Sequence, residues 1–382
     1  MPVLAAFGGV TLILLILWDA FEAIVLPRRV MHKWRLARFF YRTSWALWSA
    51  FARRIKKSKR RETYLSFYGP LSVLILLVIW ALAMLFGFAC VQWGLGSAIS
   101  GTSGRRGFSW DLYFSGSTFF TLGLGDLVPQ SLPARVFTIV EAGLGFGFLA
   151  MVIGYLPILY QAFSRREVEI TLMDARAGSP SAAVELLVRQ AKSGDFTQAI
   201  CLFFAEWEHW SAELLESHLS YPLLAYYRSQ HDNQSWLGAL TTVLDASAMV
   251  LAGVEGHAAW QAKLTFAMAR HAVVDLSQVF GSAPLPPSRD RLPREDFDVA
   301  FETLAAAGIP IKRSPVVEAK LAGLRGMYEP YVNSLSVRLM MALPPWLPGP
   351  RRKENWLTSA WEHGEIAVSN AADIIPIVNT KR

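Results

Sequence analysis

The sequence is poor in cysteine and in charge. Its 382 residues include two cysteines, Cys90 and Cys201, which lie in no CxxC or metal-ligand spacing. This absence excludes a disulfide framework and a cysteine-based metal site. Charged residues make up 18% of the chain and hydrophobic residues 53%. A composition this apolar is unusual for a soluble protein of this length and indicates an integral membrane protein.

Motifs of catalytic chemistry are also missing. The sequence has no P-loop, no HExxH pair and no catalytic triad pattern, so we expect no enzymatic activity. No GxGxxG turn lies between a strand and a helix, which argues against a Rossmann-type regulatory domain. We therefore expect no organic cofactor.

Acidic residues are absent from one long segment. Arg28–Arg61 holds 13 Lys and Arg residues and no Asp or Glu. Positive charge beside a membrane span stays on the cytoplasmic side, so 28–64 is predicted to be a basic cytoplasmic or interfacial helix that meets anionic inner-leaflet lipid. Within it, Trp34–Ala52 fits either an amphipathic helix on the membrane surface or a plain cytoplasmic helix. The rest of the chain is not basic, so we expect no nucleic-acid partner.

Three stretches are long and apolar enough to cross a membrane. They run from about Val3 to Leu26, over 65–93 and over 134–163. The first, within residues 1–27, lacks a basic start and a small-residue cleavage site, so we expect a transmembrane helix rather than a signal peptide. The positive charges then predict a multi-pass protein of the cell membrane, with the N-terminus outside and the C-terminus in the cytoplasm.

The loop between the last two spans carries the functional signal. A Gly- and Ser-rich turn at 94–107 leads into an aromatic segment, 108–120, which suits a short helix that dips into the membrane and returns. Next come Thr121, Leu122, Gly123, Leu124, Gly125 and Asp126. Glycine at alternate positions allows positive φ, which turns successive carbonyls to one side. Four copies around an axis would stack carbonyls and the Thr121 hydroxyl into rings that replace the hydration shell of a cation, with Asp126 at the outer mouth.

This hexapeptide, 121–126, resembles the selectivity filter of the potassium-channel superfamily, Thr-Val-Gly-Tyr-Gly-Asp. The sequence GDLVPQSLPAR that begins at Gly125 resembles the bacterial two-helix, proton-gated channels. The resemblance covers 65–163 and implies an outer helix, a pore helix, a filter and an inner helix. It also implies a homotetramer, because each chain has one pore loop, and K⁺ ions bound by the carbonyls of Thr121 to Leu124. The expected fold is an all-α membrane protein: this module, one extra N-terminal transmembrane helix and an all-helical cytoplasmic domain.

Two departures from the family pattern bear on selectivity. Leu124 stands where the family has a filter tyrosine, so it cannot donate a hydrogen bond to the pore helix. This leaves a non-selective cation channel as an alternative to a potassium-selective one. Ser117 stands where the family has a pore-helix glutamate, and Glu141 is a charge inside a span. Both are candidates for supporting the filter, and a protonation sensor is the alternative role of Glu141.

The last span contains residues that loosen a helix. Gly145 falls where the family has its hinge glycine, Gly147 follows two residues later, and Pro157 removes a backbone donor. These three are candidates for a gate. The alternative is close packing of small residues against a neighbouring helix.

Residues 164–382 have the composition of a soluble domain. Apolar residues recur at helical spacing, which predicts helices near 181–191, 196–217, 236–254, 257–280 and 318–341. Pro-rich stretches at 282–296 and 343–355 predict loops. The domain follows the inner helix directly, so we expect it to assemble or gate the pore. The sequence leaves its ligand open, and a non-conducting receptor or scaffold with an active cytoplasmic domain is a third alternative.

Overall fold

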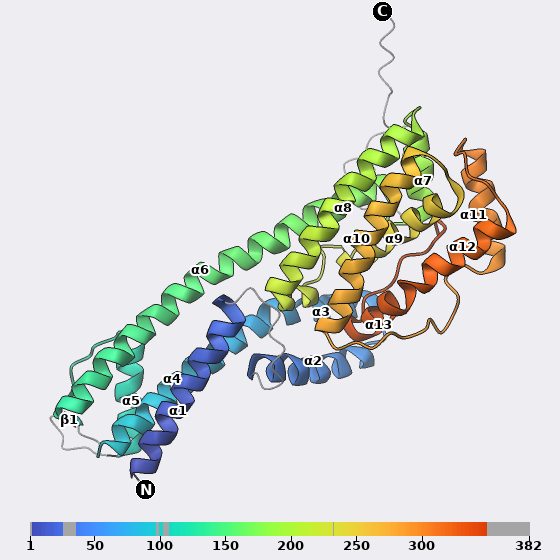
Figure 1. The fold of residues 1–382 in the computed structure, drawn as a ribbon. Coiled ribbons are helices and arrows are strands. Elements are labelled where there is room, and N and C mark those ends of the chain that lie inside the picture. The colour runs from blue at the N-terminus through green and yellow to red at the C-terminus, as the bar shows by residue number, and fades with distance from the viewer. Residues whose placement is uncertain (1, 26–35, 97–98, 102–106, 232, 350–382) are drawn as a thin grey trace, which may run out of the picture.

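A computed structural model of the protein describes residues 2–25, 36–96, 99–101, 107–231 and 233–349. Within these ranges the chain is almost entirely helical and elongated (Figure 1). The first half contains α1 (Pro2–Ala20), the π-helical turn η1 (Phe21–Val25), α2 (Leu36–Arg54), α3 (Ser58–Ser66), α4 (Tyr68–Gly94), β1 (Ile99–Gly101), α5 (Phe108–Phe119), β2 (Leu127–Pro129) and α6 (Leu132–Ala177). The second half contains α7 (Ala183–Ala191), α8 (Phe196–Ser220), the 3₁₀ turn η2 (Pro222–Tyr226), α9 (Trp236–Gly253), α10 (His257–Val279), α11 (Arg294–Ala306), α12 (Pro315–Gly326) and α13 (Glu329–Leu339).

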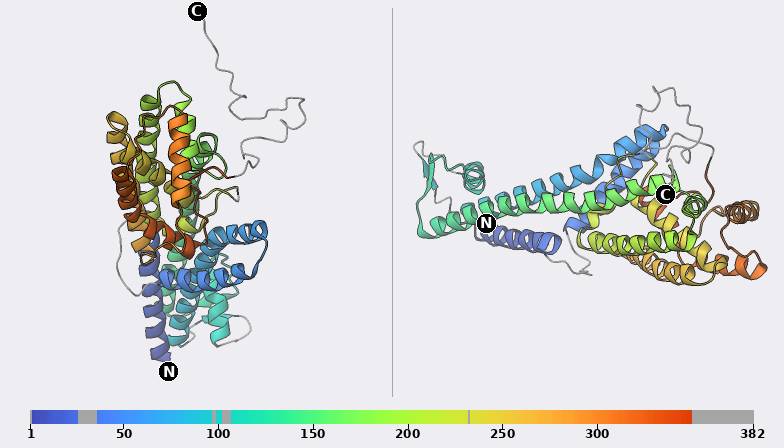
Figure 2. Two further views of the ribbon diagram at one scale, coloured as in Figure 1. Left: turned by 90° about the vertical axis from the view of Figure 1, so that its right-hand side faces the viewer. Right: turned by 90° about the horizontal axis from the view of Figure 1, so that it is seen from above.

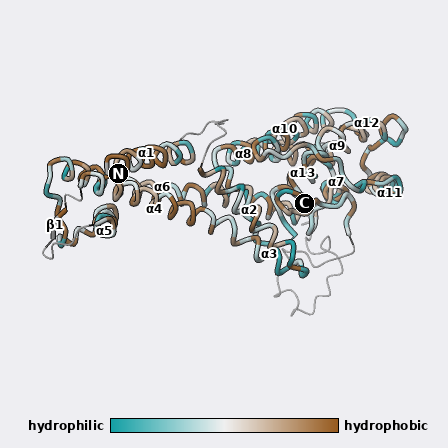
Figure 3. Tube along the Cα trace, turned by 90° about the horizontal axis from the view of Figure 1, so that it is seen from below, coloured by the Kyte–Doolittle hydropathy of each residue, from teal (hydrophilic) through white to brown (hydrophobic). Residues whose placement is uncertain are grey.

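Four of the described helical segments are long and apolar enough to cross a membrane. One of them, α9, has 94% of its residues buried inside the helical second half, so it is a core helix there. The other three are α1, α4 and α6, and hydrophobic residues follow them through the narrow end of the molecule (Figure 3). The N-terminus and the α5 loop lie at the same end of these helices (Figure 1).

The extra helix α1 packs along α4 through glycine. A Cβ added to Gly9 would lie 2.4 Å from the Gly87 carbonyl oxygen, and one added to Gly87 would lie 2.8 Å from the Ile13 side chain. Small residues let two helix backbones approach closely where no hydrophobic effect drives them together. The contact therefore fixes α1 against α4.

A carboxylate at the C-terminal end of α1 joins three helices. The two Asp19 oxygens accept hydrogen bonds from the backbone N–H of Ala37, at 3.1 and 3.3 Å, in the first turn of α2. Asp19 Oδ2 also accepts one from the indole Nε1 of Trp80 in α4, at 2.9 Å. A negative charge at a helix start satisfies an otherwise unpaired N–H and favours the helix dipole.

Helix α2 lies across the direction of α1 and α4, at the end of the spans that is nearer the second half of the chain (Figure 2). Its buried face contacts the second half of the chain, where the Trp45 indole donates a hydrogen bond of 2.9 Å to the carbonyl of Arg338. Its other face leaves an apolar stripe exposed, made of Phe39, Leu47 and Phe51. Helix α2 is therefore amphipathic, with one apolar face on protein and one uncovered.

Helix α6 does not end near residue 163, as the hydropathy predicts, but continues to Ala177. Ile170, Met173 and Ala177 are buried in the core of the second half. The prediction failed because the polar residues after 163 end the hydrophobic run while keeping helical propensity. One helix thus belongs to both halves of the molecule.

The structure also corrects three smaller predictions. The fold is not wholly helical, because β1 and β2 form a short antiparallel pair in the outer loop. The single helix expected over 318–341 is two helices, α12 and α13, which meet near Met327 and Tyr328. Helix α11 begins at Arg294, inside the expected loop 282–296, and was missed. Residues 350–382 of the expected cytoplasmic domain lie outside the described chain.

A buried histidine joins α8 to α6. His218 Nδ1 lies 2.8 Å from the Leu214 carbonyl oxygen. A carbonyl oxygen can only accept, so Nδ1 carries the proton and donates it. The other ring nitrogen, Nε2, then accepts a hydrogen bond from Arg166 at 3.3 Å. Arg166 also donates to the carbonyls of Leu224 and Tyr227 and pairs with Glu167. Burial and the neighbouring guanidinium hold the pKa of His218 well below its usual value.

This junction predicts a loss of stability in acid. A histidine that stays neutral in the folded state is protonated in the unfolded state once the pH falls below about 6.5, the pKa of an unperturbed histidine. The free energy of unfolding then falls by up to about 1.4 kcal/mol per pH unit. We expect the apparent melting temperature of the purified protein to fall between pH 7.5 and 5.5, and to fall less in His218→Gln. The exposed His209 provides the control: an equal effect in His209→Gln would contradict the assignment to His218.

Candidate functional site

The outer loop is held between the two long helices that flank it. Helix α5 packs against α4 and α6, and the loop returns through β2, which pairs with β1 from Ile99↔Pro129 to Gly101↔Leu127. The β1–β2 pair joins the chain that precedes α5 to the chain that precedes α6. The chain between the end of α5 and β2 is therefore anchored at both ends.

The backbone of this connecting segment alternates in hand. Thr121, Gly123 and Gly125 have φ of 57°, 60° and 76°, whereas Leu122 and Leu124 between them do not have positive φ. Glycine takes such angles without a side-chain penalty, and threonine does so at a cost of roughly 1–2 kcal/mol. Alternation of this kind turns successive carbonyl groups the same way. The pattern of glycines in the sequence is thus matched by the backbone angles.

Ser117 attaches the segment to the last turn of α5. Its carbonyl oxygen accepts hydrogen bonds from the backbone N–H groups of Leu122 at 2.8 Å and Gly123 at 3.4 Å. Its hydroxyl oxygen lies 3.5 Å from the N–H of Leu124, at the limit of a hydrogen bond. Ser117, a candidate filter support from the sequence, therefore contacts three consecutive residues of the segment.

A second neighbour of the segment was missed by sequence analysis. Tyr113, on α5, lines the same groove as Asp126 at the far end of the segment, and the Asp126 carboxylate raises the pKa of the Tyr113 hydroxyl. The far end of the segment thus lies beside α5 as well. Aromatic residues are so frequent in 108–120 that nothing in the sequence singled out Tyr113.

Glu141 lies behind α5 and not on the segment. It is fully buried on α6, and the Ser115 hydroxyl donates to its Oε2 at 3.4 Å. Its Oε1 has no hydrogen-bond partner in the described part of the chain. The contact joins α6 to α5 one helical turn before the position of Gly145.

Gly145 lies at the closest approach of α6 to α5. A Cβ added there would be 2.0 Å from the carbonyl oxygen of Phe119, the last residue of α5. The same test at Gly147 finds no atom within 4 Å. Pro157 lies inside α6, which continues through it. Gly145 is therefore at a close helix contact, while a hinge at Gly145, Gly147 or Pro157 stays a prediction.

The side chains of the segment are uncovered within one chain. Leu122 is 62% exposed and Leu124 59% exposed. A groove of about 340 Å³ lies beside them, between the segment, α5 and α6. In the described residues there is also no group of His, Cys, Asp and Glu side chains that could hold a metal ion. Backbone carbonyls and the Thr121 hydroxyl are oxygen ligands that this segment can offer to a cation.

Comparison with known proteins gives two findings. Residues 73–162 match a family model described as an ion channel. The chain is 23% identical over 312 residues to YdjJ, an uncharacterized membrane protein of Bacillus subtilis, a match that covers 80% of this chain and 82% of the relative. No solved structure matches the chain. The region from α4 through α5 to the first part of α6 is thus similar to an ion channel family, in a chain similar to a bacterial membrane protein.

Proposed function

We propose that the protein is a potassium-selective channel. The carbonyls of Thr121, Leu122, Gly123 and Leu124, with the Thr121 hydroxyl, would bind K⁺ ions in succession as they cross the membrane. Asp126 would concentrate cations at the outer mouth. The observation that carries this proposal is the alternation of positive φ at Thr121, Gly123 and Gly125, because it gives the carbonyl oxygens a common direction in which they can replace water around a cation.

A tetramer follows from the same proposal. One chain carries one pore loop, and a closed ring of carbonyls needs several copies. The apolar window of α6 is only 11% buried within a single chain, and Leu122 and Leu124 face outward. Neighbouring subunits would cover these surfaces and fill the groove beside the filter. Light scattering of the purified complex should give the mass of four chains, and a monomer that conducts would contradict this arrangement.

We also propose that the N-terminus and filter face outward and the helical domain faces the cytoplasm. The basic segment then lies inside, as positive charge requires. The apolar stripe of α2 would rest on the inner leaflet, with Arg38, Arg42, Arg53 and Arg54 exposed beside it to meet anionic headgroups. Arg28 and its neighbours up to residue 35 lie outside the described residues.

A non-selective cation channel is the second candidate, and Leu124 favours it. Its side chain cannot replace the hydrogen bond of a filter tyrosine, and its N–H lies 3.5 Å from the Ser117 hydroxyl. A loosely braced carbonyl ring discriminates less between K⁺ and Na⁺ than a firmly held one.

The reversal potential separates these candidates. With K⁺ on one side of a planar bilayer and Na⁺ on the other, we expect the current of the purified protein to reverse near the potassium equilibrium potential. Gly123→Ala should lower the K⁺/Na⁺ permeability ratio about tenfold, because a left-handed backbone costs a side-chain-bearing residue roughly 1–2 kcal/mol.

Gly143→Ala is the matched control, since nothing lies within 4 Å of an added Cβ there. A wild-type reversal near zero would establish the non-selective channel. Absence of current in every condition, with an intact tetramer, would favour the receptor or scaffold.

The packing of Gly145 gives a prediction about the pore helix. Gly145→Ala should displace α5 or α6, because its Cβ would meet the Phe119 carbonyl. Overpacking of this kind costs about 1–3 kcal/mol, so we expect a lower melting temperature of the tetramer and a lower K⁺/Na⁺ permeability ratio. Gly147→Ala should change neither. Equal behaviour of the two variants would show that Gly145 is not held by this contact.

The stripe on α2 gives a prediction about lipid. With Cys90 and Cys201 replaced by serine, a spin label at Leu47→Cys should be more accessible to oxygen than to a polar nickel complex in vesicles that contain anionic lipid. Arg38→Gln with Arg42→Gln should weaken this difference. A label at Leu202→Cys, exposed on α8, should favour the nickel complex. The same accessibility at both sites would refute a membrane contact of α2.

A further inference from the structure

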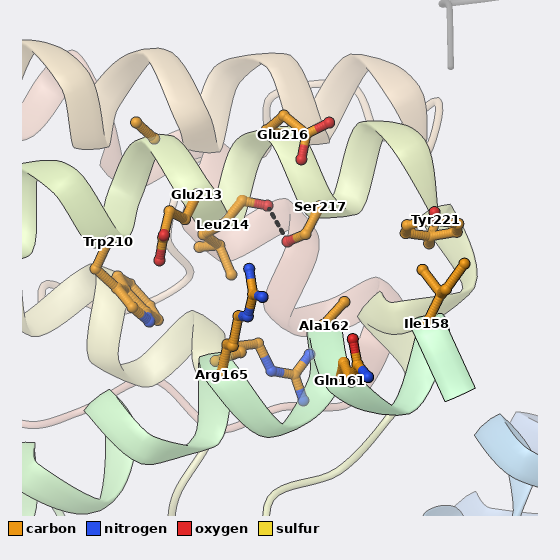
Figure 4. A pocket seen from close by; sticks show the side chains of 12 residues that line it. Ile158, Gln161, Ala162, Arg165, Trp210, Glu213, Leu214, Glu216, Ser217 and Tyr221 are labelled. Carbon is orange, nitrogen blue, oxygen red and sulfur yellow. Dashed lines mark hydrogen bonds between the residues drawn. The ribbon is translucent and has the colours of Figure 1, made fainter. Parts of the chain in front are cut away.

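A pocket of about 480 Å³ lies between α6 and α8, where α6 leaves the apolar span (Figure 4). Helix α6 contributes Ile158, Ala162 and Arg165 to its lining, and α8 and the residue after it contribute Trp210, Glu213 and Tyr221. None of these residues belongs to the filter or to its supports. The pocket therefore has no role in the proposed conduction.

The two ends of the pocket differ in polarity. Ile158 and Tyr221 lie at one end, and Arg165, Trp210 and Glu213 gather at the other (Figure 4). The end at Ile158 and Tyr221 lies nearer the candidate membrane spans, because Tyr221 and Ala162 pack in the same apolar cluster as residues of α1 and α4. The pocket thus changes from apolar to polar in the direction that leads from the membrane to the cytoplasmic domain.

Two donors at the polar end, buried Trp210 and exposed Arg165, have no hydrogen-bond partner among the described residues. Trp210 is 3% exposed, and its indole Nε1 forms no hydrogen bond within the described chain; Figure 4 shows this nitrogen on the side of the ring that faces α6. Arg165 likewise has no ion pair or hydrogen bond among the described residues, whereas its neighbour Arg166 is fully engaged with Glu167 and backbone carbonyls. A buried N–H without a partner costs about 1–3 kcal/mol, which a bound acceptor would offset.

An acceptor lies opposite these donors. The exposed Glu213 carboxylate lies 3.3 Å from Nε2 of the exposed His209, and it also raises the pKa of Glu169. The polar end therefore offers a cation and a buried N–H on one side and a carboxylate on the other. A ligand that matches it carries a negative and a positive group close together, joined to an apolar body.

We propose that the pocket binds a phospholipid whose headgroup carries a primary ammonium, such as phosphatidylethanolamine. The phosphate would accept hydrogen bonds from Arg165 and Trp210, the ammonium would donate to Glu213, and the acyl chains would follow Ile158 toward the bilayer. A net anionic headgroup would meet the Glu213 carboxylate without compensation. A quaternary choline headgroup has no N–H to donate to that carboxylate.

Native mass spectrometry of the full-length protein in detergent tests this proposal. We expect added phosphatidylethanolamine to bind at one lipid per subunit, more tightly than phosphatidylglycerol or phosphatidylcholine. Arg165→Gln should weaken it about tenfold, the usual effect of losing a hydrogen bond to a charged group. Trp210→Phe, which keeps the ring and removes the N–H, should weaken it less. Glu213→Gln should remove the preference for phosphatidylethanolamine over phosphatidylglycerol.

Matched controls separate the site from general surface charge. Arg294→Gln and Glu302→Gln, at exposed side chains of α11, should leave lipid binding unchanged. Ala162→Phe, which fills the apolar end, should block binding without a change of charge. Equal lipid binding in all variants would overturn the proposal. Displacement of the lipid by free phosphoethanolamine alone would also overturn it, because it would show a soluble ligand. The readout is independent of conduction, so failure here leaves the proposed channel function intact.

Discussion

Helix α6 is the constraint on which both halves of the molecule depend. Its 46 residues span about 69 Å at 1.5 Å per residue. Toward one end Gly145 lies at the closest approach to the Phe119 carbonyl of α5, and toward the other Ile170 and Met173 are buried in the core of the second half. Because the same helix packs on α5 and forms part of that core, a rotation of the second half would be carried to the end of α5 without an intervening linker.

The sequence predicted the parts that local physics determines. The candidate spans were evident from hydrophobic runs, and the glycine alternation at Gly123 and Gly125 predicted the left-handed backbone that the structure has there. The continuation of α6 beyond residue 163 could not be predicted in the same way. Its polar residues are equally consistent with a new helix after a loop, and only burial of Met173 against distant helices distinguishes the two.

Residues whose role depends on a distant partner were out of reach of sequence analysis. His218 has no neighbour in the sequence that marks it, and Arg166 meets it from 52 positions away. Tyr113 is one aromatic residue among several, and Asp126 is 13 residues further on. Likewise the close approach of Gly145 to α5 depends on one carbonyl on another helix. Such contacts belong to the tertiary structure, which hydrophobic periodicity does not encode.

The carboxylate of Asp19 has a mechanical consequence. It accepts hydrogen bonds from the start of α2 and from the indole of Trp80 in the middle of α4 at the same time, so both bonds persist only while the three helices keep their relative positions. A bilayer whose thickness changes the tilt of α1 against α4 must therefore carry α2 along or break one of these hydrogen bonds. Since Trp45 of α2 is in turn bonded to the end of α13, strain in the lipid is linked to the helical second half by a path that runs through α2 and not through α6.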